Sequence, residues 1–119
     1  MKTATLETSK KLQEAGIDVD TQFNWLKSHI TSDCIRVFEV SENDLELFSL
    51  ICPAPTFDEC WQLLPHVILI GGERAVKELN NKAIGYYSLH GDDQEFSIED
   101  NIAEACAQLA LWLKSNGHL

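Results

Sequence analysis

The segment from Asn101 to Gly117 constrains the fold more than any other part of the sequence. Asn101 is a favoured helix-capping residue, Glu104 follows three residues later, and Gly117 supplies a typical helix end. Between them, apolar residues recur at helical spacing: Ile102, Ala105, Cys106, Leu109, Trp112 and Leu113. The pattern predicts a helix over residues 102–115, and a continuous apolar face of this kind must be covered by another layer of the protein.

A second helix is predicted over residues 56–64. Thr56 and Glu59 have the spacing of a capping box, in which each side chain accepts a hydrogen bond from the other residue's backbone N–H. Pro65 ends the helix, because the residue before a proline avoids the helical conformation. The buried stripe of this helix is formed by Phe57, Cys60, Trp61 and Leu64.

A short N-terminal helix is predicted over residues 6–15. Leu6, Leu12 and Ala15 recur at near-helical spacing, and Gly16 offers the left-handed conformation that often follows a helix end. Its apolar stripe is thin, so this helix must pack against the body of the protein.

The rest of the chain is rich in strand patterns. Gly71-Gly72 predicts a tight hairpin after an apolar strand, and the return segment 74–79 suits either a strand or a helical turn. Tyr86 and Tyr87 should face opposite sides of their strand. The segment 45–54 is apolar without a clear period and is expected to be irregular. The predicted strands are 22–26, 35–40, 67–70, 84–89 and 95–98.

This order of elements predicts an α+β fold. Short turns between strands favour antiparallel pairing, and helices segregated from the strands argue against a doubly wound sheet. We expect a single domain over residues 1–119, with one mainly antiparallel twisted sheet of about five to six strands packed by two or three helices.

The charge of the chain limits its partners. Nineteen acidic residues against nine basic ones give a formal net charge of −10. Such a field repels phosphate, so direct binding to nucleic acid or to an anionic membrane surface is not expected. No apolar run approaches the roughly 20 residues of a membrane helix, and the first residues do not resemble a signal peptide. We therefore expect a cytoplasmic protein.

The four cysteines, Cys34, Cys52, Cys60 and Cys106, do not have the spacing of zinc ligands or of a redox pair. We expect four free structural thiols. Cys52 paired with His66 or His90 would make a nucleophile and base, but nothing near Cys52 in the sequence lowers its pKa. The other histidines, His29 and His118, lack a ligand partner at helical spacing and read as solvated residues.

The acidic and glycine-rich turns also carry no recognisable site. Asp92-Asp93 with Glu95, and Glu99-Asp100, lack the spacing of a calcium loop. Gly71-Gly72-Glu73-Arg74 lacks the Lys and Ser or Thr of a phosphate loop. No catalytic, cofactor-binding or metal-binding residue is assigned.

Three segments together resemble a family of small uncharacterised proteins of phages, prophages and other mobile elements of Bacteroidetes and Firmicutes. They are Leu6 to Ser9 with Leu12 and Ala15-Gly16, Cys52 to Trp61 through Leu64-Pro65, and Asn101 to Ala105 through Leu111-Trp112-Leu113 and Gly117. The order of elements has a looser likeness to a phage α-β-α sandwich domain. The resemblance implies a mobile-element protein and names no activity.

Three functions are compatible with these features. The leading hypothesis is a non-catalytic accessory or protein-interaction protein, binding a protein partner or forming a homodimer through an unpaired strand edge. An alternative is an acidic mimic that occupies a host nucleic-acid-binding protein. A small enzyme using Cys52 with a histidine is the third.

Overall fold

The computed structural model of the chain describes residues 2–19, 21–28, 35–39, 48–89, 91 and 93–119. Within these residues the helices are α1 (Leu6–Glu14), α3 (Phe57–Leu63) and α4 (Ile102–Ser115). The strands are β1 (Phe23–Ser28), β2 (Ile35–Glu39), β3 (Phe48–Pro53), β4 (Val67–Ile70), β5 (Glu73–Leu79), β6 (Ala83–Ser88) and β7 (Gln94–Ser97). The helices lie within one residue of the ranges that the sequence predicts.

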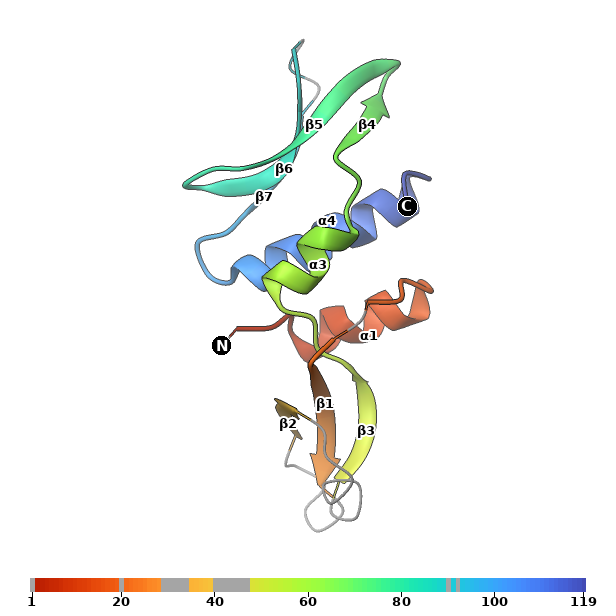
Figure 1. Cartoon of the computed structure of the whole chain (residues 1–119), viewed down its shortest axis with the longest axis vertical. Coiled ribbons are helices and arrows are strands. Elements are labelled where there is room, and N and C mark those ends of the chain that lie inside the picture. Colours follow the sequence, from red (N-terminus) through yellow and green to blue (C-terminus); the bar gives the residue numbers. More distant parts are fainter. Residues whose placement is uncertain (1, 20, 29–34, 40–47, 90, 92) are drawn as a thin grey trace.

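The helices form a central layer between two antiparallel sheets (Figure 1). One sheet has the strand order β2-β1-β3, and the other has the order β4-β5-β6-β7. The molecule is elongated, with principal extents of 54 × 27 × 20 Å and a radius of gyration of 15.9 Å. A compact domain of this length would have a radius of gyration of about 13.5 Å. The difference arises because the three-stranded sheet extends from one end of the helix layer.

The predicted α+β fold with antiparallel strands is confirmed. The strands are divided between two sheets of three and four strands, however, and the single sheet of five to six strands is corrected. The cause is the short path between β3 and β4. The chain passes from Pro53 at the end of β3 directly into α3. After α3 ends near Pro65, the chain continues into β4 on the other side of the helix layer, so β3 and β4 belong to different sheets.

The segment 45–54, expected to be irregular, contains the strand β3; residues 45–47 lie outside the described part. β3 lacks a clear apolar period because Ser49 and Leu50 are both exposed while Cys52 is buried. Its strand conformation comes from pairing with β1, in a register that shifts between Trp25 and Leu26. Such pairing is a property of the tertiary structure, which overrides local sequence preference.

The return segment after Gly71-Gly72 is the strand β5, so the helical-turn alternative is wrong. Gly71 and Gly72 have φ angles of 59° and 84°, which is the conformation of a type I′ hairpin turn. The alternation of β5 looks poor in the sequence because Lys77 shares the inward face with Ala75.

The main core lies between the helices and the inner face of the four-stranded sheet. α4 is its central element, contacting α1, α3, β6 and β7. Tyr86 is fully buried in this core, whereas the Tyr87 hydroxyl bonds to Glu95, so the two rings face opposite sides as predicted. The largest fully buried side chains of the core include Tyr86, Ile84, Leu109 and Leu113.

Glu104 joins the start of α1 to α4. Its Oε1 accepts hydrogen bonds from the Thr5 backbone N–H at 2.9 Å and from Thr5 Oγ1 at 3.0 Å. Its Oε2 accepts from Thr8 Oγ1 at 2.5 Å and from Gln108 Nε2 at 3.0 Å. Burial alone would raise the pKa of Glu104, but these hydrogen bonds outweigh it and lower the pKa. The carboxylate also lies at the N-terminus of α1, where the positive end of the helix dipole stabilises a negative charge.

Candidate functional site

The thiols of α3 and α4 are structural. Cys60 and Cys106 are fully buried, free and in contact across the two helices. The hydrogen bond with Cys60, followed by burial, raises the pKa of Cys106. Cys106 is therefore a neutral thiol, and both buried side chains pack as small apolar groups. Cys52 is free as well, and Cys34 lies outside the described residues.

The structure does not bring Cys52 and His66 together. Cys52 is buried in β3, and burial raises the pKa of its thiol despite the opposing influence of Lys10. His66 is exposed and directly precedes β4, which belongs to the four-stranded sheet at the other end of the molecule (Figure 1). His29 and His90 lie outside the described part, so the pairing of Cys52 with His90 is not placed. The described residues therefore supply no activated nucleophile at Cys52.

The acidic turn before β7 is occupied by internal hydrogen bonds. Asp93 Oδ1 accepts from the Ser88 backbone N–H at 3.0 Å, and Glu95 Oε2 accepts from the Tyr87 hydroxyl at 2.7 Å. Burial and the contact with Glu95 raise the pKa of Tyr87 to about 12. Asp92 lies outside the described residues. Among those described, no three His, Cys, Asp or Glu side chains gather as metal ligands would.

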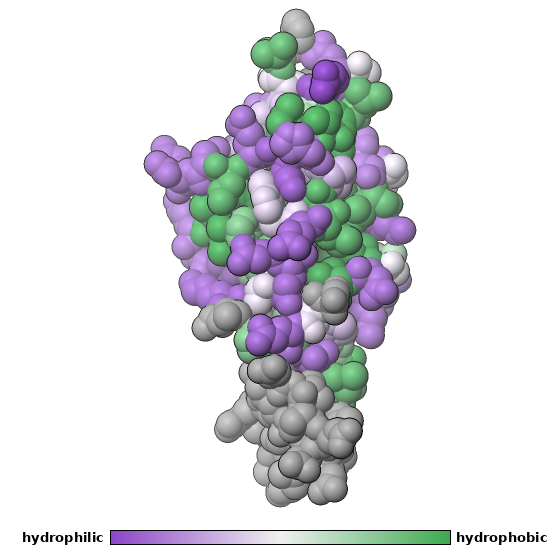
Figure 2. All heavy atoms as spheres, in the orientation of Figure 1, coloured by the Kyte–Doolittle hydropathy of each residue, from purple (hydrophilic) through white to green (hydrophobic). Residues whose placement is uncertain are grey.

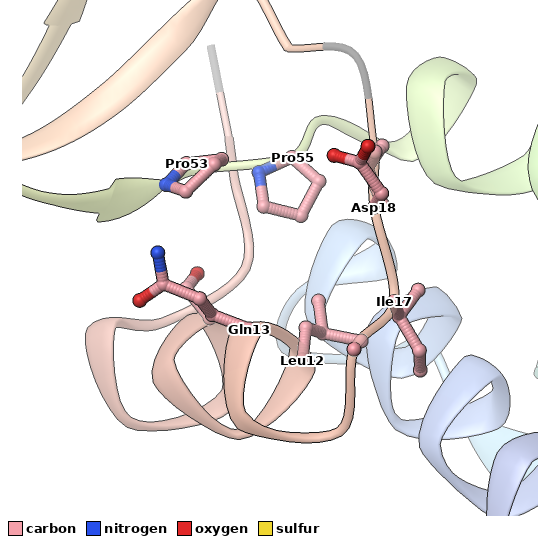
Figure 3. Close-up of a pocket in the computed structure, with 9 residues that line it drawn as sticks. Leu12, Gln13, Ile17, Asp18, Pro53 and Pro55 are labelled. Carbon is pink, nitrogen blue, oxygen red and sulfur yellow. The ribbon is translucent and has the colours of Figure 1, made fainter.

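A half-open cavity of about 240 Å³, here called the proline pocket, lies between the end of α1 and the end of β3 (Figure 3). Leu12, Ile17 and Val19 contribute apolar lining, and Figure 3 shows Pro53 and Pro55 across the pocket from Leu12. In Figure 3 the Gln13 amide points towards Pro53 and the Asp18 carboxylate points towards Pro55. The remaining lining residues are Ser9 and Gly16.

The local sequence sets the shape of one wall of this pocket. Gly16 adopts a φ of 76°, and its N–H donates to the Gln13 carbonyl at 3.1 Å. The Ile17 N–H donates to the Leu12 carbonyl at 3.0 Å. These two bonds are the Schellman ending of a helix, in which the residue after the glycine packs back on the last turn. The motif fixes Ile17 beside Leu12 in the wall of the pocket.

A second candidate feature is the free edge of β4. Among the described residues β4 pairs only with β5. The Lys77 N–H donates to the His66 carbonyl at 2.9 Å. In an antiparallel pair this hydrogen bonding alternates along the strand, so the backbone N–H and C=O groups of His66, Ile68 and Ile70 are those that face β5. The backbone groups of Val67 and Leu69 therefore point away from the sheet.

Apolar side chains accompany this free edge. Leu69 is 59% exposed, and the side chain of Val67 lies next to that of its cross-strand neighbour Val76 on the outer face. We call Val67, Leu69 and Val76 the β4 edge patch. Figure 2 shows apolar residues over the end of the molecule where β4 lies. All four residues of β4 are apolar, without the lysine or proline that commonly protects a sheet edge.

Lys77 and the proline pocket are absent from the sequence-based predictions. Lys77 Nζ donates to the carbonyls of Trp61 at 3.0 Å and Leu64 at 3.2 Å, and lies 4.2 Å from the centre of the Trp61 ring. Burial lowers the pKa of Lys77, against an opposing influence of Cys106. The ammonium thus satisfies carbonyls at the C-terminus of α3, where the helix dipole favours a cation. No sequence signal marks this placement, because a lysine in a strand is ordinarily exposed to solvent.

Comparison with models of known protein families gave no match, and comparisons with curated proteins and with solved structures gave none either. No helix of the described residues has both the length and the apolar character needed to cross a membrane.

Proposed function

We propose that this chain is a non-catalytic protein-interaction protein that binds its partner through the free edge of β4. The observation that carries the proposal is the combination of outward backbone groups at Val67 and Leu69 with an apolar strand and an exposed Leu69 side chain. An unpaired edge of this kind accepts an additional strand, with the backbone giving affinity and the alternate side chains giving specificity. On the resemblance alone, we also propose that the protein serves a phage or mobile element.

The partner that fits this edge is a second copy of the chain. In an antiparallel pair of β4 strands, Val67 stands opposite Leu69 of the second copy, and the two-fold axis repeats the same pairing. Both positions have outward backbone groups, so the pair forms about four hydrogen bonds. The β4 edge patches of the two copies then meet on one face of a continuous sheet, as an isologous interface requires.

Two effects make this association weak. β4 has only four residues, so the contact is smaller than the roughly 1,200 Å² of a stable interface. The net charge of −10 on each copy also opposes approach, and salt screens this repulsion. We therefore expect a monomer in dilute solution at low salt and a growing dimer fraction as protein and salt concentrations rise.

Sedimentation velocity across protein and salt concentrations tests this proposal with two variants. Leu69→Lys places a charge on the β4 edge and should abolish dimerisation. Leu50→Lys is the matched control, because Leu50 is 56% exposed on β3 of the other sheet and the change in net charge is the same. A protein that stays monomeric at high concentration and high salt, or a Leu69→Lys variant that dimerises as well as Leu50→Lys, would overturn the proposal.

A further inference from the structure

The proline pocket has the properties of a preformed site. The Schellman ending holds Leu12 and Ile17 in place, and the ring constraint of Pro53 and Pro55 stiffens the facing wall. Pro55 is itself fully buried, and its carbonyl accepts the Ala4 N–H at 2.9 Å. A ligand entering such a pocket would not have to order its walls, which removes one of the main costs of binding.

The size of the pocket limits its occupant. Sites for drug-sized molecules generally enclose roughly 300–1,000 Å³, whereas this cavity is about 240 Å³ and open on one side. It is large enough for one long side chain. The open side leaves room for the backbone that would carry that side chain.

The charge of the pocket selects a cation. Among the described residues that line it, Asp18 is the only ionisable one, and the protein as a whole carries a net charge of −10. The Gln13 amide adds a neutral oxygen that can accept a hydrogen bond. In Figure 3 the Gln13 amide and the Asp18 carboxylate lie at opposite ends of the pocket, with Pro53 and Pro55 between them, so a cation at Asp18 has apolar proline surface beside it for its methylene stem.

The same features favour lysine over arginine. A guanidinium has five donors in a fixed fork, and with a single carboxylate in the pocket several of them would remain unpaired. An ammonium has three donors at the end of an unbranched stem of methylene groups. The stem suits the apolar walls, and the donors suit one carboxylate and water.

We infer that the proline pocket binds the side chain of a lysine presented by another protein, with its methylene groups against Pro53 and its ammonium at Asp18. This inference does not depend on the pairing of β4, which lies in the four-stranded sheet on the other side of the helix layer (Figure 1). It assigns to an acidic protein a recognition site for a basic residue.

Titration of the isotope-labelled protein, followed by amide NMR shifts, tests the inference. The probes are lysine blocked at both backbone ends, the equally blocked norleucine and free n-butylammonium. Blocked lysine should give saturable shifts around residues 12–19 and 53–55 in the millimolar range. Norleucine, which keeps the stem and lacks the ammonium, should bind about fivefold more weakly, as expected for the loss of one exposed ion pair.

Asp18→Asn is the informative variant, and Glu14→Gln is its matched control. Both remove one negative charge from an exposed residue near the end of α1, but Glu14 lies outside the proline pocket. Asp18→Asn should weaken blocked lysine about fivefold and leave norleucine unchanged, while Glu14→Gln should change neither appreciably.

Several results would overturn the inference. They are the absence of saturable shifts at tens of millimolar lysine, equal binding of lysine and norleucine, and equal effects of Asp18→Asn and Glu14→Gln. Binding of n-butylammonium at least as tight as that of blocked lysine would assign the pocket to a free amine and reject a protein lysine as its occupant.

Discussion

Gly85 occupies a position in β6 that should not tolerate even one added methyl group. It is buried between Glu78 of β5 and Glu95 of β7, its cross-strand neighbours. A Cβ atom placed on Gly85 would lie 2.1 Å from the Gln94 carbonyl oxygen and 2.8 Å from the Glu95 Cα. Ordinary contacts between heavy atoms begin near about 3.5 Å. Because the obstructing atoms belong to the backbone of β7, no side-chain rotation relieves the clash.

Two opposing effects decide the stability of Gly85→Ala. Gly85 is not among the glycines with positive φ, so alanine can adopt its backbone conformation, and the loss of unfolded-state freedom would stabilise by about 0.4–1 kcal/mol. Overpacking of a well-filled site costs about 1–3 kcal/mol, and a backbone displacement of about 1 Å belongs at the upper end of that range. The clash should win, leaving a net loss of about 2 kcal/mol in the free energy of unfolding.

Urea unfolding followed by tryptophan fluorescence measures this loss, and thermal unfolding should show a midpoint lower by about 8 °C. Glu78→Ala is the control, because Glu78 is exposed on the same face of the sheet and its truncation adds no atom; its effect should stay within about 0.5 kcal/mol. If Gly85→Ala is as stable as the parent or more stable, β7 does not approach β6 as the structure shows.

Three further predictions follow from other parts of the molecule. Glu104→Gln should lower the free energy of unfolding by about 1 kcal/mol at pH 7, because it weakens the charge-assisted bonds from Thr5 and Thr8. The pKa of Glu104 is lowered in the folded state, so its contribution is present above the unfolded-state pKa near 4.5 and is lost as pH falls through the folded-state pKa. The difference in urea unfolding between variant and parent should therefore shrink as pH is lowered below 4.5; a difference that does not change with pH would contradict this. Thiol titration of the denatured, unreduced protein should count four free cysteines, and a count of two or none would reveal disulfides. Mobility-shift assays at low salt should show no binding of duplex or single-stranded nucleic acid, because the net charge of −10 opposes phosphate contact; salt-sensitive binding of random DNA at micromolar protein would contradict this.

Local signals in the sequence determined the helices and the tight turn between β4 and β5. Thr56 and Glu59 form the predicted capping box, with the Thr56 N–H donating to Glu59 Oε1 at 2.9 Å. Asn101 Oδ1 accepts from the Ala103 N–H at 3.0 Å. Gly71-Gly72 turns the hairpin with positive φ angles. These features were predictable because a cap or a tight turn depends on atoms within a few residues of each other along the chain.

The sequence also supplied one wall of the proline pocket without revealing the pocket. Gly16 indicated how α1 ends, and that ending fixes Leu12 beside Ile17. The opposite wall comes from Pro53 and Pro55, far along the chain, and they face α1 only because β3 pairs with β1 and leads into α3. The pocket therefore needs the tertiary structure for its existence, although every residue in it was visible in the sequence.

Only the tertiary structure decided that the strands form two sheets and that β3 is a strand. Ser49 and Leu50 carry no apolar alternation, and their conformation depends on hydrogen bonding to β1. The inward placement of Lys77 likewise depends on the carbonyls of Trp61 and Leu64 above it, which satisfy a cation that the strand pattern alone would place in solvent. In each case the deciding interaction joins residues distant in sequence, and the free energy of such a contact exists only once the chain has brought them together.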